Sequence, residues 1–154
     1  MKRMIRLFID GEVPSQNVTD RMHWRERHNL LSRWRFQVRQ AMTPTGFPMY
    51  ALKPQGKVSV AITAYRRRKI TDHANIVGGC KGLIDALTYN CLIVDDSEKW
   101  ATFSYDQRLA SHPLNPFRNP NGTGRIGTVV EITEDRKENH GSGSGSGDGD
   151  AGDR

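Results

Sequence analysis

The pattern of hydrophobic and polar residues predicts four strands along the chain. The clearest is residues 57–68, KVSVAITAYRRR, where Val58, Val60, Ile62 and Ala64 alternate with other residues. Alternation of this kind is typical of a strand with one buried face. Three further segments alternate more loosely and are also predicted to be strands: residues 4–9, 100–105 and 125–134.

Two segments have helical periodicity instead. In residues 29–42 large apolar side chains recur at every fourth position, at Leu30, Trp34 and Val38. This spacing places them on one helix face, and Asn29 can cap the first turn. The second predicted helix spans residues 80–89, and its apolar face contains three residues: Leu83, Ile84 and Leu87.

Segments rich in Pro, Gly and Asn separate these elements and are predicted to be loops: residues 13–17, 43–56 and 106–124. The resulting order is β-α-β-α-β-β. We therefore expect a single α+β domain with one mixed sheet and helices on one face. We assign residues 1–138 to this domain and residues 139–154 to a disordered tail. The tail includes the run GSGSGSGDGDAGDR, which has no large apolar residue to bury.

The net charge favours a polyanionic partner. The chain has 23 Lys and Arg against 17 Asp and Glu, a net charge of +6. The last 14 residues hold three of the acids and one of the bases, so residues 1–140 carry a net charge of +8. Nucleic acid and an anionic membrane both fit this charge. Arg35 and Arg39, one helical turn apart, are candidates for phosphate contacts, although a solvated helix face explains them equally well.

Several classes of protein do not fit the sequence. No run of 18 apolar residues is present, so we expect no transmembrane helix. The start, MKRMIRLFIDGEVP, lacks the uninterrupted apolar core of a signal peptide. The two cysteines, Cys80 and Cys91, have neither CxxC nor metal-finger spacing. These features predict a reduced, cytoplasmic protein without membrane association.

Three acidic residues flank the second predicted helix. Asp72 follows the strand at 57–68, and Asp95 and Asp96 end an apolar run at 92–94. A helix that folds back on the sheet can bring both loops to one edge. Gathered carboxylates repel each other unless a cation lies between them, and Mg²⁺ is commonly held by one or two carboxylates, water and phosphate oxygens. Such an ion activates water for phosphodiester hydrolysis.

Basic residues accompany these carboxylates and would attract a nucleic-acid backbone. They are Arg66, Arg67, Arg68, Lys69 and Lys81. Each part also has a simpler structural explanation. The acidic pair can end a turn, Asp72 can cap a helix, the arginines can end a strand, and Lys81 can pair with Asp85 one turn later.

Taken together, residues 66–100 resemble the signature of RusA-like Holliday junction resolvases, a family of phage and prophage endonucleases. The matching residues are Arg66-Arg67-Arg68, Asp72, Asn75, Lys81, Asp85-Ala86-Leu87 and Leu92-Ile93-Val94-Asp95-Asp96. Pro14-Ser15-Gln16-Asn17 also resembles the turn that follows the first strand in that family. The resemblance covers roughly residues 4–134 and is specific only at 66–100.

The resemblance implies a Mg²⁺-dependent endodeoxyribonuclease, with Mn²⁺ able to substitute, that resolves four-way DNA junctions during recombination and repair. It implies a homodimer in the cytoplasm of a bacterial host, associated with the nucleoid. Asp72 and Asp96 would be the metal ligands, Asp95 would assist, and Lys81 would contact the scissile phosphate. The residues expected to contact DNA are Arg66, Arg67, Arg68, Lys69, Asn75, Arg35 and Arg39.

One departure from the family pattern leaves two interpretations open. The second Asp of the family's D-x-D-N motif is Ala74 in this chain, and alanine cannot bind a metal. Cleavage either persists with the remaining carboxylates or is weakened, so that the protein mainly binds branched DNA. A third interpretation is an RNA-binding domain that stacks bases on Trp100, Phe103 and Tyr105. Because Trp100 is out of phase with the other two, packing in the core explains them better.

Overall fold

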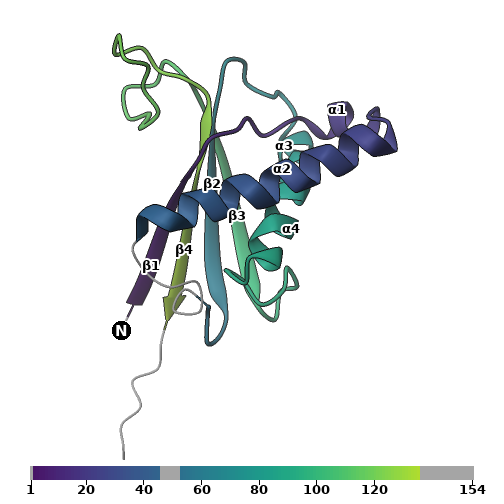
Figure 1. Cartoon of the computed structure of the whole chain (residues 1–154), viewed down its shortest axis with the longest axis vertical. Helices are drawn as coiled ribbons and strands as arrows, with labels where there is room; N and C mark the ends of the chain where they lie inside the picture. Colours follow the sequence, from purple (N-terminus) through teal and green to yellow (C-terminus); the bar gives the residue numbers. More distant parts are fainter. Residues whose placement is uncertain (1, 46–52, 136–154) are drawn as a thin grey trace, which may run out of the picture.

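A four-stranded mixed sheet is the framework of the protein in its computed structural model (Figure 1), which describes residues 2–45 and 53–135. The strands are β1 (Lys2–Ile9), β2 (Val58–Arg66), β3 (Ala101–Leu109) and β4 (Gly127–Asp135). Their order in the sheet is β1-β4-β2-β3. β2 and β3 are parallel, and the other neighbours are antiparallel. The α+β fold and mixed sheet predicted from the sequence are confirmed.

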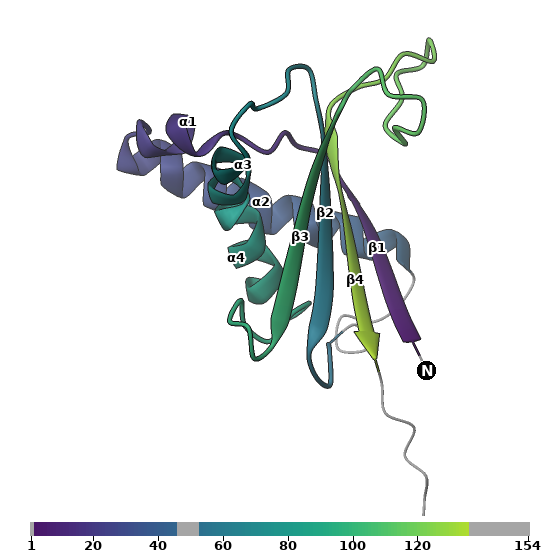
Figure 2. The same ribbon diagram turned by 180° about the vertical axis from the view of Figure 1, so that it is seen from behind.

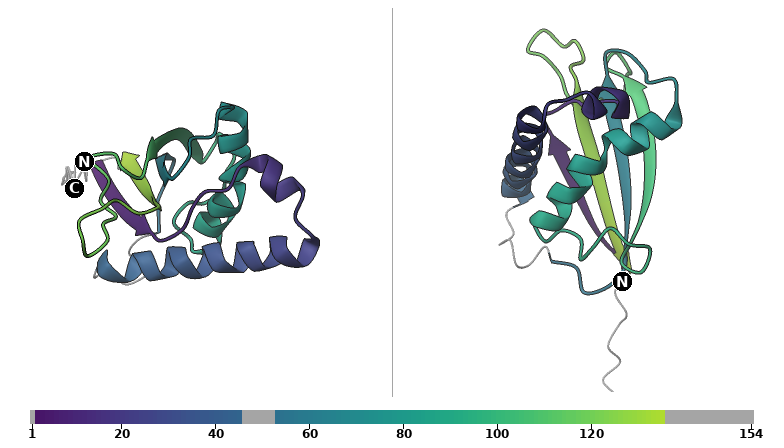
Figure 3. Two further views of the ribbon diagram at one scale, coloured as in Figure 1. Left: turned by 90° about the horizontal axis from the view of Figure 1, so that it is seen from above. Right: turned by 90° about the vertical axis from the view of Figure 1, so that its right-hand side faces the viewer.

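The helices cover one face of this sheet, as predicted. They are α1 (Gln16–Asp20), α2 (Trp24–Met42), α3 (His73–Gly79) and α4 (Lys81–Tyr89), with a short 3-10 helix, η1 (Thr43–Thr45). Figure 2 shows the sheet from its uncovered side, and the two views of Figure 3 show the helices together on the other side. α2 packs against α4, and α1 packs against α3. None of the described helices is long and apolar enough to span a membrane.

The core lies between the sheet and the helices. Every second residue of β1 is buried, and the register places Ile5 opposite Ile132 and Leu7 opposite Val130. The apolar sides predicted for the clearest strand and for both helices are buried as well, including Val60, Ile62, Trp34, Val38, Leu83 and Leu87. Burial of one face thus explains why periodicity located these three elements.

Helix α2 begins at Trp24 rather than at residue 29, and Asn29 is not its cap. The cap is His23, whose Nδ1 accepts a hydrogen bond from the Arg25 N–H at 3.3 Å. The first turns of α2 extend beyond the sheet (Figure 3). Because they bury no apolar residue, the sequence there contains no hydrophobic period that would reveal a helix.

Helices α1 and α3 were not predicted. α1 includes the end of the predicted loop at 13–17, and α3 contains two glycines, which are poor helix formers. Tertiary packing explains α3, because the backbone at Gly79 lies directly against the Pro14 carbonyl.

Strand β3 also continues into the loop predicted at 106–124. Gln107 fixes this extension, because its side chain bonds both the Ile70 N–H, at 2.8 Å, and the Ile70 carbonyl, at 2.6 Å. The predicted tail at 139–154 and the middle of the predicted loop at 43–56 lie outside the described residues.

Candidate functional site

Asp72 caps the N-terminus of α3. Its carboxylate accepts a hydrogen bond from the Ala74 N–H at 3.0 Å, and its carbonyl accepts one from the Asn75 N–H at 3.0 Å. The Asp72 side chain remains exposed to solvent, and Asn75 is half-buried. The carboxylate is therefore both the helix cap considered from the sequence and an accessible oxygen donor.

Tyr105 on β3 interacts with a residue from each of the two acidic loops. The ring of His73, next to Asp72, lies edge-on to the Tyr105 ring with centroids 6.4 Å apart. The pKa of Tyr105 is raised, first by burial and then by the charges of Cys80 and Asp96. Asp96 therefore acts on the same residue that His73 contacts. The fold brings these two segments, 23 positions apart in sequence by residue number, to one edge of the sheet.

Asp95 has a local role in the second loop. Its Oδ1 accepts a hydrogen bond from the Asp96 N–H at 2.9 Å. This bond and a further one from the Ser97 side chain lower the pKa of Asp95. The Ser97 carbonyl then accepts bonds from the N–H groups of Trp100 and Ala101, where β3 begins. Asp95 thus holds the turn that places Asp96 beside the strand.

These residues do not form a preformed metal cage. Across residues 2–45 and 53–135, no three Asp, Glu, His or Cys side chains are grouped closely enough to hold a metal ion. Mg²⁺ needs only one or two protein carboxylates where phosphate oxygens and water complete its shell. Asp72 and Asp96 are exposed oxygen donors, Asp72 next to His73 in sequence and Asp96 near enough to Tyr105 to affect its pKa, so they fit this second mode of binding.

Cys80 is buried near Tyr105, and as a protonated thiol it is not a metal ligand. It is fully buried, and burial raises the pKa of its thiol to about 12, although the charge of Arg66 opposes the shift. Metal ligation and nucleophilic attack both require the thiolate. Cys80 is therefore a core residue at neutral pH, in agreement with its place on the apolar side of α4.

Lys81 lies in the first turn of α4. It is exposed and lines a pocket of about 270 Å³ between α1, α2 and α4, together with Asp85 and Arg27. In the described part of the chain no ion pair joins Lys81 to Asp85, Asp72 or Asp96. Its ammonium group is therefore available for an external anion.

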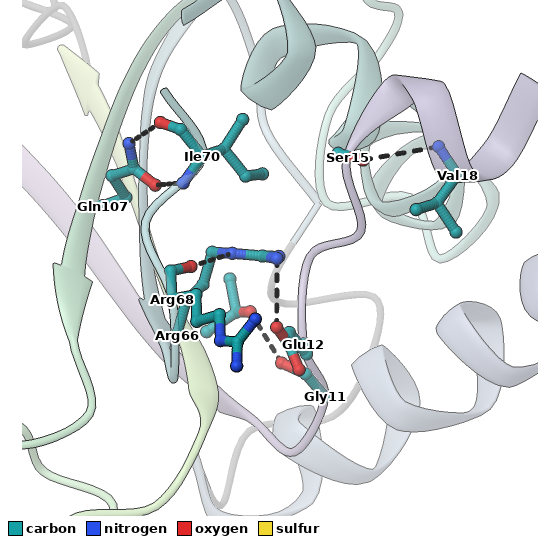
Figure 4. A network of polar contacts seen from close by, with 9 residues as sticks. Gly11, Glu12, Ser15, Val18, Arg66, Arg68, Ile70 and Gln107 are labelled. Carbon is teal, nitrogen blue, oxygen red and sulfur yellow. Dashed lines mark hydrogen bonds and ion pairs between the residues drawn. The ribbon is translucent and has the colours of Figure 1, made fainter. Parts of the chain in front are cut away.

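The four consecutive basic residues that begin at the last position of β2 fall into two groups, and Figure 4 shows the contacts of the first, Arg66. The Arg66 side chain is only 12% exposed, forms an ion pair with Glu12 at 3.1 Å and donates to the Arg68 carbonyl at 3.1 Å. These contacts describe a structural role at the strand end. Arg67, Arg68 and Lys69 are exposed and can reach a phosphate.

The arginines predicted on α2 are both exposed. The Arg35 guanidinium lies 4.3 Å from the centre of the Tyr89 ring, and Arg39 is one turn further along the helix. Phe103 and Tyr105 stack on each other and pack against the main core, as the core interpretation predicted.

Sequence reasoning missed Trp24, which is 66% exposed, and the contact of Tyr105 with His73. Trp24 precedes the periodic part of its helix. Only the arginines near Trp24 in the sequence would have indicated that it is a candidate binding residue.

The two segments that carry the RusA resemblance pack on each other. Ser15 caps α1 by accepting a hydrogen bond from the Val18 N–H at 3.3 Å. α1 packs on α3, where Gly78 lies against the Gln16 side chain and Gly79 lies against Pro14. No protein-family model matches the chain, and no curated protein matches it significantly. Membership of the RusA family stays a prediction from the motif residues.

Proposed function

We propose that the protein is a Mg²⁺-dependent endonuclease that cuts branched DNA, with four-way junctions as the expected substrate. Two observations support the proposal. His73, next to Asp72, contacts Tyr105, and the charge of Asp96 in a separate loop raises the pKa of the same tyrosine, on a strongly basic domain. Carboxylates gathered on a basic surface suit phosphodiester hydrolysis better than simple DNA binding, because uncompensated acids would repel the phosphates.

Each residue then has a distinct task. Asp72 and Asp96 would hold the Mg²⁺ ion, which when bound supplies a Lewis acid and an activated water. Lys81 would bind a non-bridging oxygen of the scissile phosphate and stabilise the charge that develops there. Arg67, Arg68 and Lys69 would hold the strand on either side of it, and Asp95 would keep Asp96 in place.

The wider parts of the proposal come from the resemblance alone. They are a homodimer that cuts two opposing strands, Mn²⁺ as a substitute for Mg²⁺, and a role in recombination and repair in the cytoplasm of a bacterial host. The dimer supports paired cleavage, because a four-way junction offers two equivalent strands.

Cleavage of a fixed four-way junction tests the proposal, with Asp96→Asn compared against Asp106→Asn. Asp106 is a matched control, because it neighbours Tyr105, is exposed, and forms an ion pair with Arg108 at 3.3 Å. We expect paired Mg²⁺-dependent nicks near the branch point, slowed roughly 100-fold or more by Asp96→Asn. Asp106→Asn should cut like the wild type. Intact junction, fork and flap DNA in both Mg²⁺ and Mn²⁺ would refute the nuclease.

Ala74 supports a second candidate, a branched-DNA-binding protein with weakened catalysis. Ala74 is exposed in the first turn of α3, where the family motif has an Asp. The Ala74→Asp variant decides between the two, with Ala74→Asn as an uncharged control of the same size. A large gain in cleavage with Ala74→Asp alone would identify the weakened protein. No gain over an already active wild type would show that the three carboxylates suffice.

A further inference from the structure

The N-terminal end of α2 projects beyond the sheet (Figures 1 and 3), and its first residue is an exposed tryptophan, Trp24. Trp24 is 66% exposed, the highest value for an aromatic residue in the described chain. A single exposed apolar side chain is ordinary on a protein surface. Its significance here comes from how the ring is held and from the charges around it.

The Trp24 ring is fixed by its two neighbours in sequence. The His23 ring lies 5.6 Å from it between centroids, and His23 is itself held by its bond to the Arg25 N–H. The Arg25 guanidinium lies 5.2 Å from the centre of the indole. A preorganised aromatic ring loses little conformational entropy when it binds. The tip of α2 thus presents an exposed indole with an imidazole and a guanidinium beside it.

The rest of α2 continues this surface. The helix contains five arginines and one acid, Glu26. No ion pair in the described part of the chain involves any of these arginines. A polyanion complements such an uncompensated row of cations better than a neutral protein surface does.

Four exposed residues of α2 lie on one side of the helix, and we call them the α2 stripe: Trp24, His28, Arg35 and Arg39. Their spacings of four, seven and four residues place them on one side of the helix. Arg35 adds Tyr89 to this surface by its contact with the ring. A helix of 19 residues is about 28 Å long, close to the ~34 Å repeat of duplex DNA.

We propose that Trp24 stacks on the free face of a base pair at the open branch point while Arg35 and Arg39 hold the phosphates of the adjoining duplex arm. The proposal rests on the proposed function for its substrate, branched DNA. An open branch point offers base pairs with a free face, whereas the interior of a duplex offers none. Arg35 and Arg39 would bind any duplex, and Trp24 would supply the selectivity for branched structures.

The test is a comparison of Kd values for a four-way junction and for a linear duplex of the same sequence, without divalent metal. Phe36 is the matched control, because it is 61% exposed on the same helix but about 120° around it from Trp24. We expect Trp24→Ala to weaken junction binding about tenfold and duplex binding less than about twofold. Trp24→Phe should retain most of the affinity, and Phe36→Ala should bind like the wild type.

Several results would overturn the inference. They are an unchanged junction Kd for Trp24→Ala, an equal loss for Phe36→Ala, and an equal loss on the linear duplex. An unchanged junction Kd for Trp24→Ala is also the result expected if Trp24 binds a protein partner instead of DNA. Because the assay needs no cleavage, its failure is separate from that of the nuclease. A protein that cuts junctions normally after Trp24→Ala refutes the stacking alone, and one that binds through Trp24 without cutting refutes the nuclease alone.

Discussion

The surface of α2 and the open face of the sheet both carry arginines, but they use them differently. On the open face Arg6 forms an ion pair with Glu131 at 2.7 Å, and Arg108 pairs with Asp106 at 3.3 Å. On α2 no described arginine has an acidic partner. The charges of these ion pairs on the open face therefore cancel each other, whereas the arginines of α2 produce a net positive potential.

This difference shows that the partner of an arginine, rather than its presence, indicates its role. An exposed ion pair contributes little to stability and cancels its own long-range field. An unpaired arginine keeps its field and can replace a counterion on a phosphate. The helix side, which also carries Asp72 and Asp96, is thus the side that we propose binds DNA.

The largest expected effect is on the free energy of unfolding, because the two sides of the sheet are packed against different kinds of atoms. A Cβ at Gly79, on the helix side, would collide with the Pro14 carbonyl, whereas a Cβ at Gly127 would collide with the Phe117 ring on the open face. Backbone yields less easily than a ring. We expect Gly79→Ala to lower the free energy of unfolding by ~3 kcal/mol and Gly127→Ala by ~2 kcal/mol.

Urea denaturation measures both values, and Gly56→Ala is the control because nothing lies within 4 Å of its Cβ position. A larger loss for Gly127→Ala would reverse the comparison. The loop packed on the open face would then be the more tightly constrained region.

The same packing explains what the sequence could and could not predict. β2 and α4 bury one regular face each, so periodicity located them to within a residue or two. α3 has no such face, and it forms because Gly79 allows close contact with Pro14. That contact joins residues 65 positions apart by number, which no local pattern contains.

The next effect is on affinity for duplex DNA. Arg35→Gln with Arg39→Gln should weaken binding tenfold to a hundredfold at ~0.1 M salt and reduce the salt slope by about 1.8, because each lost phosphate contact removes ~0.9. Arg6→Gln with Arg108→Gln makes the same change in net charge on the open face. It should change the affinity less than about twofold. Salt titrations of both double variants measure this, and equal losses would remove the distinction between the two surfaces.

The candidate site was only partly predictable for a related reason. The residue types at 72, 95 and 96 indicate a metal-dependent chemistry, but their mutual position depends on β3 and the turn before it. Arg66 shows the limit most clearly. Its sequence neighbours suggest a DNA contact, yet Glu12, from the segment after β1, pairs with its guanidinium. Only the tertiary structure separates Arg66 from Arg67 and Arg68.

The smallest effect is on the titration of Tyr105. Its pKa is raised by burial first and then by Cys80 and Asp96 on the helix side, whereas Asp106 on the open face does not contribute. We therefore expect Asp96→Asn to lower the pKa of Tyr105 and Asp106→Asn to leave it unchanged. Ultraviolet absorbance of the tyrosinate follows the titration, and Tyr105→Phe identifies its share among the four tyrosines.

The same shift has a consequence for stability. A tyrosine whose pKa is higher in the folded protein than in the unfolded chain keeps its proton longer when folded, so stability falls as pH rises from ~10 through the raised value. The fall should be shallower in Tyr105→Phe. If Asp96→Asn and Asp106→Asn moved the titration equally, Asp96 would not lie at Tyr105, and the convergence of the two acidic loops would be refuted without any assay of cleavage.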